Sequence, residues 1–388
     1  MILMAIGMPL AFSTWSALLN NFVIEVAGFT GVEIGWLHSV REIPGFLAIG
    51  VIFVLLFMRE QVLALVSLIL LGIATALTAH FPSLGGILFL TLLSSIGFHY
   101  YETVNQSLQL QWLSKERAPK VLGWLVAVGS GASLVAYLAL VALWDTLKLS
   151  YDTVYLISGG LTVVIAVAAW FIFPQFDAPV AQHRKMILRR RYWLYYALQF
   201  MAGARRQIFI VFAGFMMVER FGMAVHEVTA LFIVNYVANM AAGPFIGGWI
   251  GRFGDRNMML VQYAGLLMVF LAYGGIYAFG WGVVVASVLY VLDHLFFAMN
   301  ITLKTYFQKI ADPADIAPTA AVAFTINHIA AVFLPAALGY MWVASPGGVF
   351  VLAAGMASVS LGLSCLIPRE PAPGYETILG PGREMPVA

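Results

Sequence analysis

Residues 84–111, LGGILFLTLLSSIGFHYYETVNQSLQLQ, place polar side chains in the middle of a long apolar segment. His99, Glu102, Gln106 and Gln109 recur at intervals of three and four residues, so on a helix they lie along one face. At 1.5 Å per residue, His99 lies about 22 Å from the start of the segment, past the midplane of a ~30 Å hydrocarbon core. A charge facing lipid at that depth costs at least ~2.5 kcal/mol. We therefore expect this face to point into the interior of a helical bundle.

The composition of the whole chain indicates a membrane protein. Apolar residues make up 62% and charged residues 10% of the 388 residues, and the mean hydropathy is +0.92. Soluble domains carry about 25% charged residues, so most of the surface of this chain must face lipid. The net charge of +2 argues against a nucleic-acid partner, and a single cysteine, Cys365, excludes an internal disulfide. We interpret the apolar N-terminus as an uncleaved first span.

Apolar runs of the length of a transmembrane helix, roughly 20 residues, recur along the chain. We predict twelve spans, at residues 2–26, 32–57, 61–79, 84–112, 119–143, 152–174, 192–218, 228–251, 257–278, 281–308, 316–342 and 346–368. The predicted fold class is an all-α membrane protein with two six-helix pseudo-repeats. The predicted domains are an N-terminal half at 1–174, a basic cytoplasmic linker at 175–191, a C-terminal half at 192–368 and a disordered cytoplasmic tail at 369–388.

The distribution of Lys and Arg predicts the orientation. The odd-numbered connections hold only Lys148 and Arg220. The even-numbered connections and the tail hold Arg59, Lys115, Arg117, Lys120, Arg184, Lys185, Arg189, Arg190, Arg191, Arg252, Arg256, Lys304, Lys309, Arg369 and Arg383. Because cytoplasmic loops are enriched in these residues, we expect both termini on the cytoplasmic side of the cell inner membrane.

Two pairs of segments support an internal repeat. FVIEVAGFTGVE, at the end of the first span, aligns with FMMVERFGMAVHE at the end of the seventh. HYYETVNQSL in the fourth span aligns with HLFFAMNITL in the tenth, so that His99 matches His294 and Asn105 matches Asn300. Two alignments in corresponding helices favour a parallel six-helix repeat.

The motif GPFIGGWIGRFGDRN lies between the eighth and ninth spans. Its Gly251, Asp255 and Arg256 fit the Gly-x-x-x-Asp-Arg loop of the major facilitator superfamily, which the chain resembles from residue 2 to 368 in its six-plus-six layout and basic central loop. The resemblance implies that this loop helps to hold one side of a transporter shut. The matching first-half loop, LLFMREQVL, has lost the pattern, and the fifth span lacks the glycine–proline signature of many drug–proton antiporters. Both departures argue against a multidrug antiporter.

Polar residues from both halves are candidates for a central substrate site, which is where this superfamily binds its solutes. The substrate-binding candidates are Arg41, Arg205, Arg206, Gln199, Asn235 and Asn327. A guanidinium offers a fork of donors to carboxylate or phosphate, so we expect a small polar solute, with an anionic group favoured. Arg205 and Arg206 are neighbours and cannot both point inward equally.

Coupling to protons is expected at buried carboxyl and imidazole groups. The candidates are Glu102 with His99, Asp293 with His294, and Glu42. A histidine three residues from a carboxylate can share or pass a proton, although a static hydrogen-bonded network is an open alternative. Arg41 and Glu42 are sequence neighbours that cannot share a helix face well, so we expect each to pair with another helix.

These observations predict a proton-coupled secondary transporter that works by alternating access. The sequence contains none of the common hydrolase, metalloprotease or phosphate-loop motifs, so we expect no enzyme activity, cofactor or metal. The expected partners are the solute, protons and lipid, with a monomeric chain. A transporter-like protein serving assembly or sensing, and a facilitator of neutral sugars or drugs, are the alternatives.

Overall fold

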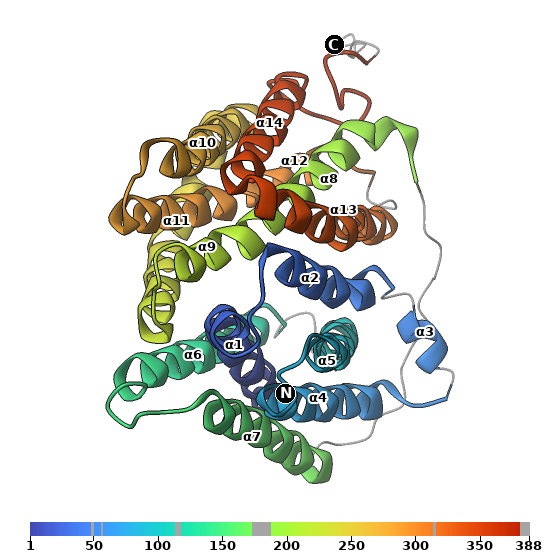
Figure 1. Cartoon of the computed structure of the whole chain (residues 1–388). Coiled ribbons are helices and arrows are strands. Elements are labelled where there is room, and N and C mark those ends of the chain that lie inside the picture. Colours follow the sequence, from blue (N-terminus) through green and yellow to red (C-terminus); the bar gives the residue numbers. More distant parts are fainter. Residues whose placement is uncertain (48–49, 56, 113–117, 173–187, 313–315, 381–388) are drawn as a thin grey trace. The chain divides into compact units, whose positions relative to one another are not determined.

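The computed structural model describes residues 1–47, 50–55, 57–112, 118–172, 188–312 and 316–380. This part of the chain is all-α and contains no strand (Figure 1). The helices are α1 (Ile2–Glu25), α2 (Gly31–Phe46), α3 (Gly50–Val54), α4 (Glu60–Leu77), α5 (Leu84–Trp112), α6 (Ala118–Leu143), α7 (Tyr151–Ile172), α8 (Trp193–Gln207), α9 (Gly214–Glu219), α10 (Val225–Phe279), α11 (Val283–Ala298), α12 (Ile301–Ile310), α13 (Ile316–Ala344) and α14 (Pro346–Cys365). Most of the predicted linker, 175–191, lies outside the described residues.

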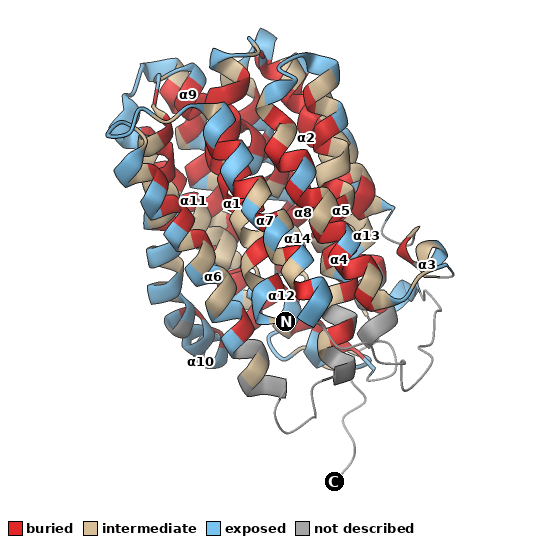
Figure 2. Cartoon of the chain, turned by 90° about the horizontal axis from the view of Figure 1, so that it is seen from below, coloured by how far each residue is buried: buried red, intermediate tan, exposed pale blue. Residues whose placement is uncertain are grey.

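Long apolar helices dominate, as predicted. Ten segments of the described chain are long and apolar enough to cross a membrane. The second predicted span is shorter than we expected, because α2 has 16 residues and ends at Phe46. Exposed apolar side chains cover the outer faces of helices such as α6 and α7, as Trp124 and Phe171 illustrate, while the facing surfaces within each unit are buried (Figure 2).

Two predicted spans, the seventh and the tenth, are interrupted, and the eighth and ninth meet at a sharp break. The eighth and ninth spans are two helices within α10 that meet at Gly254, whose φ of 80° and ψ of 160° are not helical, and this residue lies between the two predicted spans. A side chain would strain this backbone, so glycine permits the break. The tenth span is two helices, α11 and α12, separated at Met299–Asn300. In the seventh, a π-helical turn at Ile208–Ala213 joins α8 to α9.

Contacts divide the chain into two compact units. The first comprises Met1–His183 and Val218–Ile233, and the second comprises Arg184–Met217 and Val234–Ala388. The first unit therefore includes the start of α10. Asn21 of α1 donates a 2.7 Å hydrogen bond to the Met223 carbonyl, and the His226 ring lies 3.1 Å from the Asp145 carboxylate.

The repeat is visible in the backbone. Gly28 and Gly222, which align in the sequence, have φ angles of 66° and 62°. Each ends a helix in the left-handed region that favours glycine. In each copy a glutamate then caps the next helix: Glu33 accepts from the Thr30 amide at 2.8 Å, and Glu227 accepts from the Ala224 amide at 2.9 Å.

The beginning of the C-terminal tail packs against the second unit, although we expected residues 369–388 to be disordered. The Tyr306 hydroxyl of α12 donates to the Glu376 carbonyl at 2.6 Å, and the Ile378 amide donates to the Leu366 carbonyl at 2.9 Å. Glu376 and Thr377 are buried. These backbone bonds give residues 369–380 a defined place, and residues 381–388 lie outside the described part.

Candidate functional site

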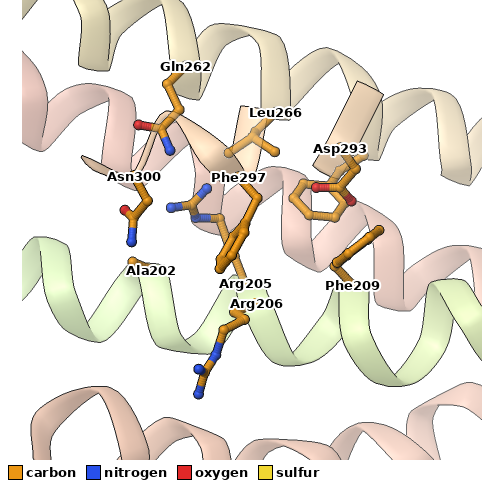
Figure 3. Close-up of a pocket in the computed structure, with 10 residues that line it drawn as sticks. Ala202, Arg205, Arg206, Phe209, Gln262, Leu266, Asp293, Phe297 and Asn300 are labelled. Atoms are coloured by element: carbon orange, nitrogen blue, oxygen red, sulfur yellow. The ribbon is translucent and has the colours of Figure 1, made fainter. Parts of the chain in front are cut away.

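A pocket inside the second unit gathers charged, amide and aromatic side chains from α8, α10 and α11 (Figure 3). It is lined by Ala202, Arg205, Arg206, Phe209, Gln262, Leu266, Phe270, Asp293, Phe297 and Asn300. Its cavity volume is only about 10 Å³ for the centre of a water-sized sphere, which is room for about one water molecule. In this conformation the pocket has room for ordered water, and a solute can enter only if the lining side chains move apart.

The two arginines of α8 point in different directions. Figure 3 shows Arg205 reaching towards Gln262, whereas the Arg206 side chain extends to the opposite side of α8. Arg205 is 5% exposed, and its guanidinium carbon lies 4.6 Å from the centroid of the Tyr263 ring. Arg206 is half-buried. The expectation that the two cannot both point the same way agrees with this geometry.

Asp293 supplies the carboxylate of the pocket. It is 2% exposed, and no ion pair within 4.0 Å joins it to Arg205 in the described part of the chain. Both residues line the same pocket. His294 follows on the same helix, with its ring centroid 5.9 Å from that of Phe209.

Several buried polar atoms of the pocket have no hydrogen-bond partner among the described residues. They are Arg205 Nε, Gln262 Oε1, Asp293 Oδ2 and Asn300 Oδ1. Burying a polar atom without a partner costs about 1–3 kcal/mol, so such atoms are normally satisfied by protein, water or ligand. One donor and three acceptors converging here mark the pocket as a place for a polar molecule.

The structure does not bring the remaining substrate candidates to this pocket. Gln199 donates to the Tyr195 hydroxyl at 3.0 Å, and Asn327 donates to the Gln199 carbonyl at 3.2 Å. The first bond lies within α8, and the second joins α13 to α8. Asn235 is buried on the first part of α10, and its Oδ1 lacks a partner among the described residues.

A second polar cluster lies in the first unit, on α2. Arg41 Nη2 is 3.5 Å from Glu42 Oε1, and Arg41 Nη1 is 3.4 Å from His38 Nδ1. The guanidinium carbon also lies 5.5 Å from the ring centroids of both Phe12 and Trp15 of α1. The expectation that Arg41 and Glu42 would not pair with each other was therefore wrong. The long arginine side chain reaches around the helix to its neighbour.

His99 joins this cluster from α5. Its Nδ1 lies 2.9 Å from the Ser95 carbonyl and 3.0 Å from Ser95 Oγ, and the Ser95 hydroxyl donates to the Arg41 carbonyl. Ser95 thus connects α5 to α2. Glu102 is half-buried on the same helix, and the Gln106 side chain lies outside the described part. Ser95 could not be singled out from the sequence, because serines in an apolar helix, such as Ser94 and Ser95, are usually packing residues.

The predicted gating loop centres on a fully buried carboxylate. Asp255 is 0% exposed, accepts a hydrogen bond from Thr305 Oγ1, and lies 2.5 Å from Lys309 Nζ. Both partners belong to α12. Gly251 is exposed and Arg256 is half-buried. The charge pair fixes the bend of α10 to the end of α12, and the sequence motif did not reveal either partner.

Long apolar helices, an internal repeat and a polar pocket within the helical bundle define a multi-pass membrane transporter. The chain belongs to the Major Facilitator Superfamily, whose model matches residues 1–335. This membership identifies a transporter of small solutes rather than an enzyme, as we predicted. No curated protein matches the chain.

Solved structures share the fold. The nucleoside transporter NupG is 14% identical with a TM-score of 0.74, over 94% of this chain and 97% of that chain. A bacterial homologue of the iron transporter ferroportin, in an inward-facing state, is 9% identical with a TM-score of 0.75, over 94% and 96%. A bacterial homologue of the human lysosomal transporter Spinster, inward-facing and occupied, is 12% identical with a TM-score of 0.71, over 94% of both chains. At these identities the similarity concerns the fold alone.

Proposed function

We propose that this protein is a proton-coupled secondary transporter that moves a small polar solute with an anionic group by alternating access. The observation that carries the proposal is the pocket of the second unit, where Arg205, Gln262, Asp293 and Asn300 present unpartnered polar atoms inside a transporter fold. Uncompensated polar atoms are costly, so their convergence favours a bound polar solute. The protein acts as a monomer in the cell inner membrane.

Each arginine has its own role in this proposal. Arg206 is half-buried and extends to the opposite side of α8 from Arg205, so in this proposal it binds the anionic group on the approach to the pocket rather than inside it. Arg205 is buried against Tyr263 and opposite Asp293, so it sets the charge balance of the pocket. Gln199, Asn235 and Asn327 shape the helices around the solute path.

Proton coupling uses the buried carboxyl and imidazole groups. Asp293 with His294 serves the second unit, and Glu42 and Glu102 with His99 serve the first. A carboxyl or imidazole group whose access to water changes between two states can load a proton in one state and release it in the other. The gating loop consists of Gly251, Asp255 and Arg256. The buried Asp255 anchors this loop to α12 through Thr305 and Lys309.

Replacing Arg206 with glutamine tests the anion proposal. A thermal-shift screen of the purified protein against metabolites first finds the solute, and uptake into proteoliposomes with a pH gradient then measures transport. We expect Arg206→Gln to lower apparent affinity about 10- to 100-fold, because a charge-assisted hydrogen bond contributes ~1.5–3 kcal/mol. Arg220→Gln, outside the pocket, is the matched control. Unchanged affinity in Arg206→Gln would point to a neutral solute.

A neutral solute is the second candidate. The Phe209, Phe270 and Phe297 rings and the Gln262 and Asn300 amides suit a ring that carries hydroxyl or N–H groups. NupG, which shares the fold, is a nucleoside transporter. The same screen separates the candidates, since it contains both anionic metabolites and neutral nucleosides and sugars.

The orientation is tested by cysteine labelling. Both termini are expected in the cytoplasm, so Lys148 faces outward and Arg189 inward. In a Cys365→Ser background, a membrane-impermeant maleimide should label Lys148→Cys in intact cells. It should label Arg189→Cys only after permeabilisation. The reverse pattern would overturn the topology.

A further inference from the structure

Ser95 lies between two elements of the proposed coupling machinery, and its contacts determine which nitrogen of His99 can take a proton. We propose that Ser95 is a positioning residue that holds His99 in the Nδ1–H tautomer. Nε2 of His99 then exchanges the coupling proton with Glu42 of α2. This inference rests on the proposed proton coupling.

The tautomer follows from the contacts of Nδ1. The Ser95 carbonyl, 2.9 Å from Nδ1, can only accept a hydrogen bond. The Ser95 hydroxyl, 3.0 Å from Nδ1, has given its own proton to the Arg41 carbonyl, so towards His99 it can only accept as well. Two acceptors facing one ring nitrogen require that this nitrogen carries the hydrogen. In the neutral ring the lone pair is then on Nε2.

Glu42 is the carboxyl that can meet this lone pair across the helix boundary. A His99 ring nitrogen and a Glu42 carboxylate oxygen lie within 4.8 Å of each other, and both side chains are buried. In the proposed step the Glu42 carboxyl gives its proton to Nε2, so that neutral glutamic acid and imidazole become carboxylate and imidazolium. Arg41, 3.5 Å from Glu42 Oε1, stabilises the carboxylate that results.

Other charged and titratable groups of the first unit surround this step. His38 on α2 lies beside Arg41, and Glu102 is on the same helix as His99. α1 presents the aromatic rings of Phe12 and Trp15 to Arg41. The sequence favoured Glu102 as the carboxyl partner of His99. The contacts of Ser95 instead tie His99 to the helix that carries Glu42.

The hydroxyl of Ser95 contacts α5 and α2 at the same time, so it can link the position of α2 to the tautomer of His99. It fixes the ring of His99 on α5 and bonds to the backbone of α2 at Arg41. Any sliding of α2 along α5 would break the bond to Arg41 and free the hydroxyl to donate to His99. The favoured tautomer would then change with the position of the helix.

The test compares Ser95→Ala and Ser95→Thr with Ser94→Ala, a half-buried neighbour on the same helix, in the full-length protein. With ¹⁵N-histidine labelling and assignment by His99→Gln, NMR should show a protonated Nδ1 and an unprotonated Nε2 for neutral His99. Ser95→Ala removes the hydroxyl acceptor and keeps the carbonyl acceptor, so we expect part of His99 to shift to the Nε2–H tautomer, while Ser95→Thr and Ser94→Ala retain the original signals.

Transport gives the second readout. Because Ser95 Oγ accepts from Nδ1, its loss weakens the imidazolium, so the midpoint of the pH profile should move about one pH unit lower in Ser95→Ala. Ser95→Thr should restore it. An Nε2–H tautomer in the unmodified protein, or an unchanged pH profile in Ser95→Ala, would overturn the inference. Failure of the unmodified protein to accumulate solute in a pH gradient would instead refute proton coupling itself.

Discussion

Replacing Gly159 with alanine will leave little stable protein, whereas the same change at the adjacent Gly160 will be tolerated. A Cβ at Gly159 of α7 would lie 2.4 Å from both the Ala76 amide nitrogen and the Gly72 carbonyl of α4. These are backbone atoms that cannot rotate away, so the two helices must separate. Overpacking costs ~1–3 kcal/mol and sometimes more. With backbone on both sides, we expect about 3 kcal/mol or more.

Gly160 provides the matched control, because nothing lies within 4 Å of the Cβ it would gain. Both changes add one methyl group to the same turn of α7, so lipid solubility and helix propensity change equally. The midpoint of heat-induced loss of the monodisperse size-exclusion peak in detergent measures the difference. Equal midpoints for the two variants would show that α4 and α7 are not packed at this distance.

Replacing Lys309 with methionine will destabilise the protein. The loss of stability will be larger in the protein with Asp255 than in the Asp255→Asn variant. Asp255 is fully buried, whereas the Lys309 side chain is 47% exposed. Breaking a buried pair leaves an uncompensated charge, at a cost of ~3–5 kcal/mol for two buried partners. We expect a smaller cost here, about 2 kcal/mol, because water reaches Lys309 and because Asp255 keeps its hydrogen bond from Thr305.

A double-mutant cycle isolates this interaction. Thermal midpoints of Lys309→Met, Asp255→Asn and the double variant are compared with those of the unmodified protein. The double variant should be more stable than Lys309→Met alone, because neutral asparagine no longer needs a cation. Strictly additive effects would mean that the pair does not join α10 to α12 energetically.

The pattern of long helices could be read from the sequence because lipid allows few alternatives to an apolar helix. The repeat could be read for a similar reason: Gly28 and Gly222 both occupy a backbone conformation that glycine adopts easily. The break within α10 falls where the sequence separates the eighth span, 228–251, from the ninth, 257–278, but its exact residue could not be predicted. Gly254 is one of several glycines in its motif, and only the backbone reveals which one leaves the helix.

The candidate site was partly predictable, because ionisable groups at membrane depth are rare and visible. Asp293 and Arg205 were identified in this way. Gln262, Tyr263 and Ser95 were missed, since uncharged residues in apolar helices give no comparable signal. The directions of Arg205 and Arg206 depend on how α8 is rotated about its axis. Packing sets this rotation, and the π-helical turn that follows α8 changes it further along the span.

The inclusion of residues 218–233 in the first unit has a consequence for biosynthesis. Asn21 and Met223 are 202 positions apart in the chain. The side-chain amide of Asn21 therefore cannot form this bond until the eight helices from α2 to α9 of the described chain have been synthesised. The first half completes its contacts only after the second half has begun to insert. A chain that stops in the central linker lacks those contacts and presents the open end of α1 to the proteases that remove unfinished membrane proteins.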